Sequence, residues 1–93
     1  MLFHVEQVHA PENCPYGRGG SPSLYDATVD AVKVVGVYGS FMAHTIFYIV
    51  EADDMEKLNK FLLPGMKVCT ARITPVSDHP LPVWDAASTE GGS

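Results

Sequence analysis

Residues 44–65, HTIFYIVEADDMEKLNKFLLPG, decide the fold, because they predict a β-strand that runs directly into an amphipathic helix. Residues 45–51 are a β-branched and aromatic run, which favours a buried strand over a helix. Asp53 stands three residues before Glu56, which is the spacing of a reciprocal capping pair at the start of a helix. This stretch therefore predicts one strand–helix unit.

The predicted helix has one apolar face and one polar face. The apolar positions recur at helical spacing and comprise Met55, Leu58, Phe61 and Leu62, whereas the opposite side carries Glu56, Lys57, Asn59 and Lys60. Pro64 and Gly65 are typical of a helix end. We expect the apolar face to pack on a sheet.

Working outward, the remaining chain supplies three strands and one further helix. Residues 2–9 predict the first strand, and the Pro- and Gly-rich residues 10–20 predict a loop. Ser21 can cap a helix with Pro22 at its first position, running to about Lys33. Its predicted apolar stripe comprises Leu24, Tyr25, Thr28, Ala31 and Val32. A strand over about 34–41 then turns at Met42 and Ala43 into the strand at 45–51, and the last strand covers 66–76, with Pro75 indicating a sheet edge.

The resulting order, β-α-β-β-α-β, predicts an α+β protein with a ferredoxin-like fold. In this fold a four-stranded antiparallel sheet has its first and third strands in the centre and both helices on one face. The ferredoxin-like domain covers residues 1–77, and residues 78–93 form a C-terminal tail that we expect to be disordered from 86 to 93. One sheet face stays bare, so we expect a homodimer that covers it, with Leu81, Val83 and Trp84 packing on the partner.

Composition limits the classes of protein and partner. The 93 residues make one domain, and 46% hydrophobic with 18% charged residues is typical of a soluble globular protein. No apolar run approaches the roughly 20 residues that span a bilayer, and no secretory signal is recognisable, so we expect a cytoplasmic protein without membrane contact. A net charge of −5 with six scattered Lys and Arg argues against nucleic acid. We expect both cysteines to be reduced.

A first candidate site follows from alternation along the strands. His4 and Glu6 fall on the strand face opposite Phe3 and Val5, and Arg72 falls on the corresponding face of the last strand. Tyr48 joins them from the strand at 45–51 if alternation places it on the same face. These side chains would form a proton-transfer or anion-binding site, with His4, Glu6, Tyr48 and Arg72 as candidate catalytic residues. The alternative is a hydrogen-bonded polar network within a dimer interface.

A second candidate site consists of His9, Cys14 and His44, which all lie near predicted strand ends or in loops. Histidine and cysteine are common ligands of zinc, nickel and copper, and Met42 would add a thioether. The alternatives are a Cys14 thiol packed into a turn before Pro15 and histidines that bond loop carbonyl groups. Cys69, in contrast, is expected in the core, because free cysteine behaves as a small hydrophobic residue.

The stretches FHVEQVHAPENCP and HTIFYIVEADDMEKLNKFL, followed by ITPV, resemble a family of small uncharacterised bacterial and archaeal proteins of the dimeric α+β barrel superfamily. The resemblance covers about residues 1–76 and includes His9 and the Cys14–Pro15 pair, with four residues between them. It implies a homodimer with facing sheets and a ligand cavity. Members of the superfamily include muconolactone isomerases, cofactor-independent and haem-degrading monooxygenases, and small nickel-binding proteins.

Three functions remain open on the sequence. The first is a homodimer that binds a metal ion or a small-molecule ligand, with His9, Cys14 and His44 as metal ligands and the group His4, Glu6, Tyr48 and Arg72 lining the cavity. The second is a cofactor-independent isomerase or monooxygenase, in which His4 or Glu6 removes a proton and Arg72 stabilises an oxyanion. The third is a structural or regulatory dimer without a site.

Overall fold

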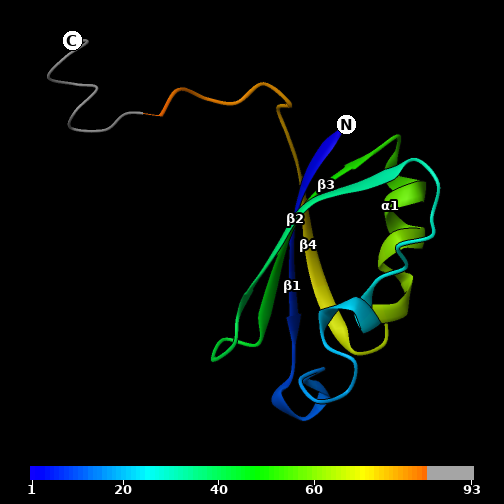
Figure 1. Cartoon of the computed structure of the whole chain (residues 1–93), viewed down its shortest axis with the longest axis vertical. Coiled ribbons are helices and arrows are strands. Elements are labelled where there is room, and N and C mark those ends of the chain that lie inside the picture. The colour runs from blue at the N-terminus through cyan, green and yellow to red at the C-terminus, as the bar shows by residue number, and fades with distance from the viewer. Residues whose placement is uncertain (84–93) are drawn as a thin grey trace, which may run out of the picture.

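The computed structural model describes residues 1–83 and arranges them as one four-stranded sheet with a helical layer on one side (Figure 1). The strands are β1 (Leu2–His9), β2 (Val32–Ser40), β3 (Thr45–Ala52) and β4 (Cys69–Val76), the α-helix is α1 (Met55–Leu62), and the short 3-10 turns are η1 (Pro11–Asn13), η2 (Ser21–Leu24) and η3 (Leu63–Gly65).

The strand order in the sheet is β2-β3-β1-β4, and all neighbouring pairs are antiparallel. The prediction that the first and third strands are central is confirmed. β4 is an edge strand, as Pro75 indicated, and its proline is paired with Phe3 of β1. The order is compatible with a ferredoxin-like fold, in which β1 and β3 each connect to a parallel strand two positions away.

The core lies between the sheet and α1. The buried side chains come from alternate positions of β1 and β3 and from one side of α1, and they include Phe3, Val5, Tyr48, Val50, Leu58, Phe61 and Leu62. The predicted apolar face of the helix is therefore confirmed at Leu58, Phe61 and Leu62, whereas Met55 in the first turn is exposed. The hydrophobic burial of this face fixes α1 on the sheet.

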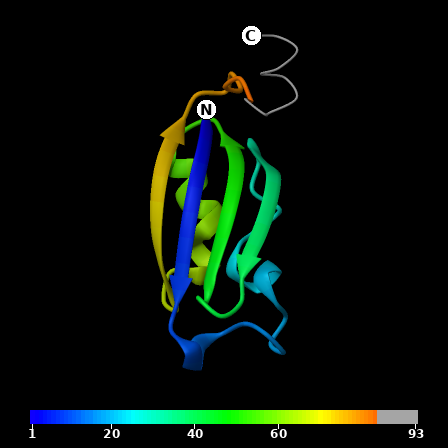
Figure 2. The ribbon, with the colours of Figure 1, turned by 90° about the vertical axis from the view of Figure 1, so that its left-hand side faces the viewer.

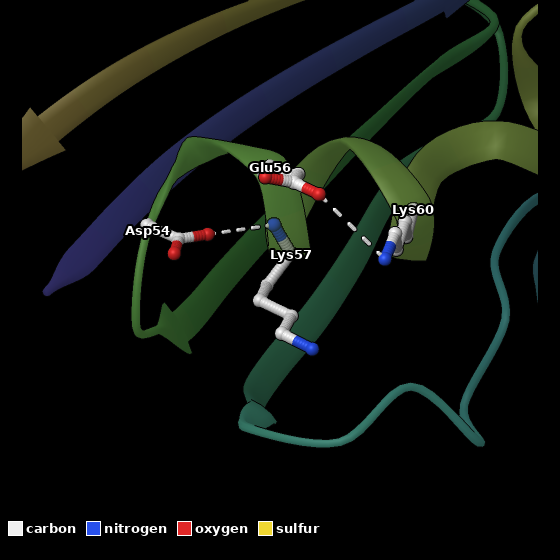
Figure 3. A network of polar contacts seen from close by, with 4 residues as sticks. All are labelled: Asp54, Glu56, Lys57 and Lys60. Carbon is white, nitrogen blue, oxygen red and sulfur yellow. Dashed lines mark hydrogen bonds and ion pairs between the residues drawn. The ribbon is translucent and has the colours of Figure 1, made fainter.

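The cap of α1 differs from the prediction by one residue. Asp54, rather than Asp53, is the N-cap, and its Oδ1 accepts a hydrogen bond of 2.9 Å from the backbone N–H of Lys57 (Figure 3). Asp54 has extended backbone angles, as an N-cap residue requires. Glu56 instead forms an exposed ion pair with Lys60, with 3.7 Å between Oε1 and Nζ, so the reciprocal capping pair is absent from the described helix end.

The predicted helix over residues 22–33 is wrong. Only the single turn η2 forms there, and Tyr25 is already extended. Asp26 then accepts a hydrogen bond from the Thr28 backbone N–H, and Ala31 has a φ of 65°, so the backbone cannot continue as a right-handed helix. Within the described residues, α1 is thus the one α-helix, and residues 10–31 form an irregular segment.

The irregular segment contributes to the core in place of the missing helix. Leu24 is buried, and the ring of Tyr25 stacks on Phe61 with 5.0 Å between centroids. The backbone N–H of Asp26 also donates to the carbonyl of Phe61 at 2.7 Å. Of the apolar stripe predicted for the helix, Leu24 is buried and Tyr25 and Val32 are partly buried, whereas Thr28 and Ala31 are exposed.

Two strand boundaries also differ from their predicted positions. β2 begins at Val32, in the region assigned to the helix, and a bulge between Val34 and Gly36 interrupts its pairing with β3. The last strand begins at Cys69 rather than at residue 66, because Val68 N–H donates to the Gly65 carbonyl in a turn. The edge strand β2 is thus longer than expected, and β4 is shorter.

The sheet face opposite α1 is bare in the single chain (Figure 2). Val8 and Tyr38 are exposed on this face, and Phe47 and Ile49 are partly exposed there. No helix of the described residues is long and apolar enough to cross a membrane. After β4, Leu81 and Val83 are exposed, whereas Trp84 and the predicted disordered tail lie outside the described residues.

Candidate metal centre

The residues predicted as metal ligands are brought together at one end of the sheet. The β2–β3 hairpin and the loop after β1 both lie at this end (Figures 1 and 2). His9 is the last residue of β1, and its backbone N–H donates to the carbonyl of His44 at 3.1 Å. The antiparallel register of β1 and β3 therefore places the two histidines opposite one another.

The hairpin turn and η1 complete the arrangement. The N–H of His44 donates to the Phe41 carbonyl at 3.1 Å, and His44 has a φ of 50°, which holds it in the left-handed region between the turn and β3. On the other side, η1 turns the chain back after β1, and the N–H of Cys14 donates to the Pro11 carbonyl at 3.2 Å. These two turns place His44 and Cys14 at the same end of the sheet as His9.

The three side chains form a compact donor cluster. One ligand atom each of His9, Cys14 and His44 lies within 4.8 Å of the other two. The two imidazole rings meet edge to face, with 5.3 Å between centroids. In a tetrahedral zinc site, bonds of about 2.0–2.3 Å place ligand atoms roughly 3.5 Å apart, so ion binding would require each pair of these atoms to approach by at most about 1.3 Å.

Three of the four imidazole nitrogens of this cluster are buried without hydrogen-bond partners. Both ring nitrogens of His9 and Nδ1 of His44 are buried and unpartnered, and His9 is only 6% exposed. Burial, and then the neighbouring His44, lower the pKa of His9. A neutral imidazole has a free lone pair on one nitrogen, which is the form that binds a metal ion.

A cavity of about 500 Å³ adjoins the cluster. It lies between the irregular segment and the ends of β2 and β3, and it is lined by His9, Cys14, Pro15, Tyr16, Gly20, Ser21, Val37, Tyr38, Gly39, Ser40, Phe41, His44, Thr45 and Ile46. No Asp, Glu, Lys or Arg is among these residues. At the rim, the rings of Tyr16 and Phe41 meet edge to face at 6.4 Å.

The resemblance implied a ligand cavity, but the sequence did not place it at this end of the sheet. Its lining residues from the irregular segment fall almost entirely in the loop predicted over residues 10–20, and apolar residues such as Val37 and Ile46 carry no signal that separates a cavity wall from a core. The aromatic residues Tyr16 and Phe41 in a Gly-rich loop and a hairpin turn were the available signal. Met42, considered as an additional ligand, is 93% exposed at the hairpin tip and does not line the cavity.

The other candidate group is only partly assembled. His4, Glu6 and Arg72 share the bare sheet face, with Glu6 directly opposite Arg72 in the β1–β4 register. Tyr48 is placed on the opposite face, where it is fully buried beneath α1 and its hydroxyl donates to Gln7 Oε1 at 2.7 Å. Tyr48 pairs with Val5, whose side chain faces the core. The alternation along β3 therefore does not place Tyr48 on the face that carries His4 and Glu6.

The two cysteines differ in their surroundings. Both are free and partly buried. Cys69 packs against the core as predicted, and burial raises the pKa of its thiol, whereas Cys14 belongs to the metal-ligand cluster. Although Cys69 is paired with His9 in the β1–β4 register, it is not part of that cluster.

Comparison with known proteins gives one match. The family described as "Domain of unknown function (DUF3303)" matches residues 1–80. No curated protein and no solved structure matches the chain.

Proposed function

The chain belongs to the DUF3303 family, whose description gives no function, and we propose that it binds a transition metal ion through His9, Cys14 and His44. One observation carries the proposal: three buried imidazole nitrogens without hydrogen-bond partners lie beside a free thiol. An unpartnered buried polar group costs about 1–3 kcal/mol. A bound ion would coordinate one nitrogen of each ring and offset part of that cost.

The donor set favours particular metals. Two imidazoles and one thiolate are borderline to soft ligands, which suit zinc, nickel and copper. Calcium and magnesium require oxygen ligands instead, and the cluster supplies no carboxylate. We therefore expect selectivity for late transition metals over the hard divalent cations.

The alternatives for these residues have less support. Histidines that bond loop carbonyl groups would have partners at their ring nitrogens, but both nitrogens of His9 lack them. A thiol packed into a turn fits Cys14, but it does not account for two imidazoles within reach of its sulfur. The isomerase or monooxygenase alternative has less support, because Tyr48, one of its four candidate catalytic residues, lies in the core.

The test is cobalt binding to protein purified without chelator and then freed of metal. Wild type is expected to bind one Co²⁺ per chain and to show a sulfur-to-cobalt charge-transfer band. Cys14→Ser should abolish this band and weaken binding by more than the roughly 10- to 100-fold typical of outer-shell changes. Cys69→Ser is the matched control, because it replaces the other partly buried cysteine, and it should retain the band.

Two results would contradict the metal proposal. One is a folded wild-type protein, checked by circular dichroism, that binds no Co²⁺, Ni²⁺ or Zn²⁺. The other is a charge-transfer band that persists in Cys14→Ser and disappears in Cys69→Ser. A second variant, His9→Gln, tests the imidazole separately and should weaken binding while leaving the cysteines in place.

A homodimer is also part of the proposal. Four strands of about eight residues cover a flat area of roughly 500 Å² at the usual strand spacing and rise, and side-chain relief increases the accessible area. A standard interface buries about 800 Å² per partner, so the bare face is of suitable size. Its apolar residues, together with Glu6 and Arg72 of opposite charge, suit a second copy of the same face.

A further inference from the structure

We propose that the metal ion keeps one coordination position open toward the cavity, and that the cavity binds a small molecule with an apolar body and one anionic metal-binding group. This inference rests on the metal site proposed above. It assigns the kind of ligand that the site would accept.

The open position follows from the number of ligands. The cluster contains three protein ligands, and no fourth His, Cys, Asp or Glu of the described residues joins it. Zinc and cobalt sites take at least four ligands, and a site with three protein ligands leaves the fourth position for water or an exogenous group. His9, Cys14 and His44 all line the cavity, so an exogenous group can reach the ion from there.

The body of the ligand follows from the cavity walls. The side chains beyond the metal ligands are mainly apolar and aromatic, among them Pro15, Tyr16, Val37, Phe41 and Ile46. A volume of about 500 Å³ falls within the range of small-molecule sites. Such walls bind an aromatic ring or a short aliphatic chain by removing its surface from water.

The rim of the cavity favours a ring in particular. Tyr16 and Phe41 are 83% and 79% exposed, although both are large aromatic side chains. They come from different segments and meet edge to face, so a bound ring could contact both of them. Ligand binding would cover part of this exposed aromatic surface.

The anionic group follows from charge balance. A divalent ion bound by one thiolate and two neutral imidazoles retains one positive charge. No Asp or Glu lines the cavity to neutralise it, and an uncompensated charge is costly in apolar surroundings. A donor with a single negative charge, such as a hydroxamate, phenolate or thiolate, would leave the site neutral.

The experiment compares two hydroxamates on the Co²⁺-loaded full chain. Benzohydroxamate and acetohydroxamate share the donor group, but only the first has a ring. We expect both to change the visible cobalt spectrum, and benzohydroxamate to bind roughly 10- to 100-fold more tightly, as burial of an aromatic side chain implies.

Cavity variants test where the ring lies. Phe41→Ala should reduce the preference for benzohydroxamate, whereas Met42→Ala, at the neighbouring exposed position outside the cavity, should not. Gly39→Leu should also reduce the preference, because a Cβ at Gly39 meets only the Phe41 ring, at 3.7 Å, and the longer side chain would fill cavity volume. Neither change removes a metal ligand.

The outcomes separate this inference from the metal proposal. If the wild-type chain binds no cobalt, the metal site itself is refuted. If cobalt binds but neither hydroxamate changes its spectrum, the metal site stands and the open position is refuted. If both hydroxamates bind with equal affinity, or if Phe41→Ala and Gly39→Leu leave the preference intact, the assignment of the cavity is refuted.

Discussion

At the scale of single residues, Tyr48 is a structural rather than a surface group. Its hydroxyl donates to Gln7 Oε1 within the core, and burial raises the pKa of the phenol. Tyr48→Phe would leave the buried Gln7 oxygen without this donor. We expect a decrease of about 1–3 kcal/mol in the free energy of unfolding, measured by urea denaturation.

Tyr16→Phe is the control for this prediction. It makes the same chemical change at a tyrosine that is 83% exposed, so the free energy of unfolding should stay within about 0.5 kcal/mol of the wild type. Equal stabilities of the Tyr48→Phe variant and the wild type would show that the buried hydrogen bond contributes little.

The candidate ligands could be found from residue type and position. His9 and His44 flank a loop and a hairpin, and β1 and β3 are neighbours in the predicted topology, so their ends had to meet. The sequence could not show that the ring nitrogens lack partners, because this depends on every neighbouring side chain. The sheet face on which Tyr48 lies depends on the exact register of β3, because a shift by one residue moves a side chain to the other face.

At the scale of elements, the cap of α1 gives a sharp prediction. Asp54→Ala removes the acceptor for the Lys57 N–H and should lower the free energy of unfolding by about 1 kcal/mol. Thermal or urea denaturation measures this change. Asp53→Ala is the matched control, because it removes the same charge one residue earlier without removing the cap.

The reverse result would overturn the assigned cap. If Asp53→Ala destabilised the chain more than Asp54→Ala, the reciprocal pair of Asp53 and Glu56 predicted from the sequence would be the cap in solution. The sequence offered two adjacent aspartates, and either could cap a helix. Which one does so depends on where the chain leaves β3, which ends at Ala52.

The strand–helix unit could be predicted because local preference and apolar spacing agree there. In residues 22–33 they conflict: the apolar spacing is helical, but Asp26 and Thr28 form a local hydrogen bond and several residues are β-branched. The core accepts Leu24 from a 3-10 turn and Tyr25 from an extended segment, so its packing does not require a helix there. Spacing therefore identified Leu24, Tyr25 and Val32 as core contacts, but it was wrong for the exposed Thr28 and Ala31 and for the secondary structure.

At the scale of the whole molecule, the bare sheet face predicts a dimer. Phe47 lies on a central strand of this face, opposite Glu6, and its ring is 6.1 Å from that of His4. Phe47→Lys would place like charges across a two-fold interface and should shift a wild-type dimer toward monomer. Sedimentation or light scattering at micromolar concentration measures the mass.

Leu63→Lys is the control for the dimer. It introduces the same charge at an exposed leucine of η3, in the helical layer away from the bare face. This variant should keep the mass of the wild type. A wild-type chain that is monomeric at these concentrations would refute the dimer, and the metal site, which one chain supplies in full, would be unaffected.

The irregular segment over residues 10–31 also bears on how this scaffold can change over time. One wall of the cavity is formed by the sheet. The other is a loop that includes Pro15, Tyr16 and Gly20, and because this loop is not an α-helix, changes in it need not keep a helical spacing of side chains. Loops tolerate substitutions and insertions better than the elements they connect. Descendants of such a chain could alter the size and shape of the accepted ligand by changing this loop, while the sheet and the metal ligands stay constant.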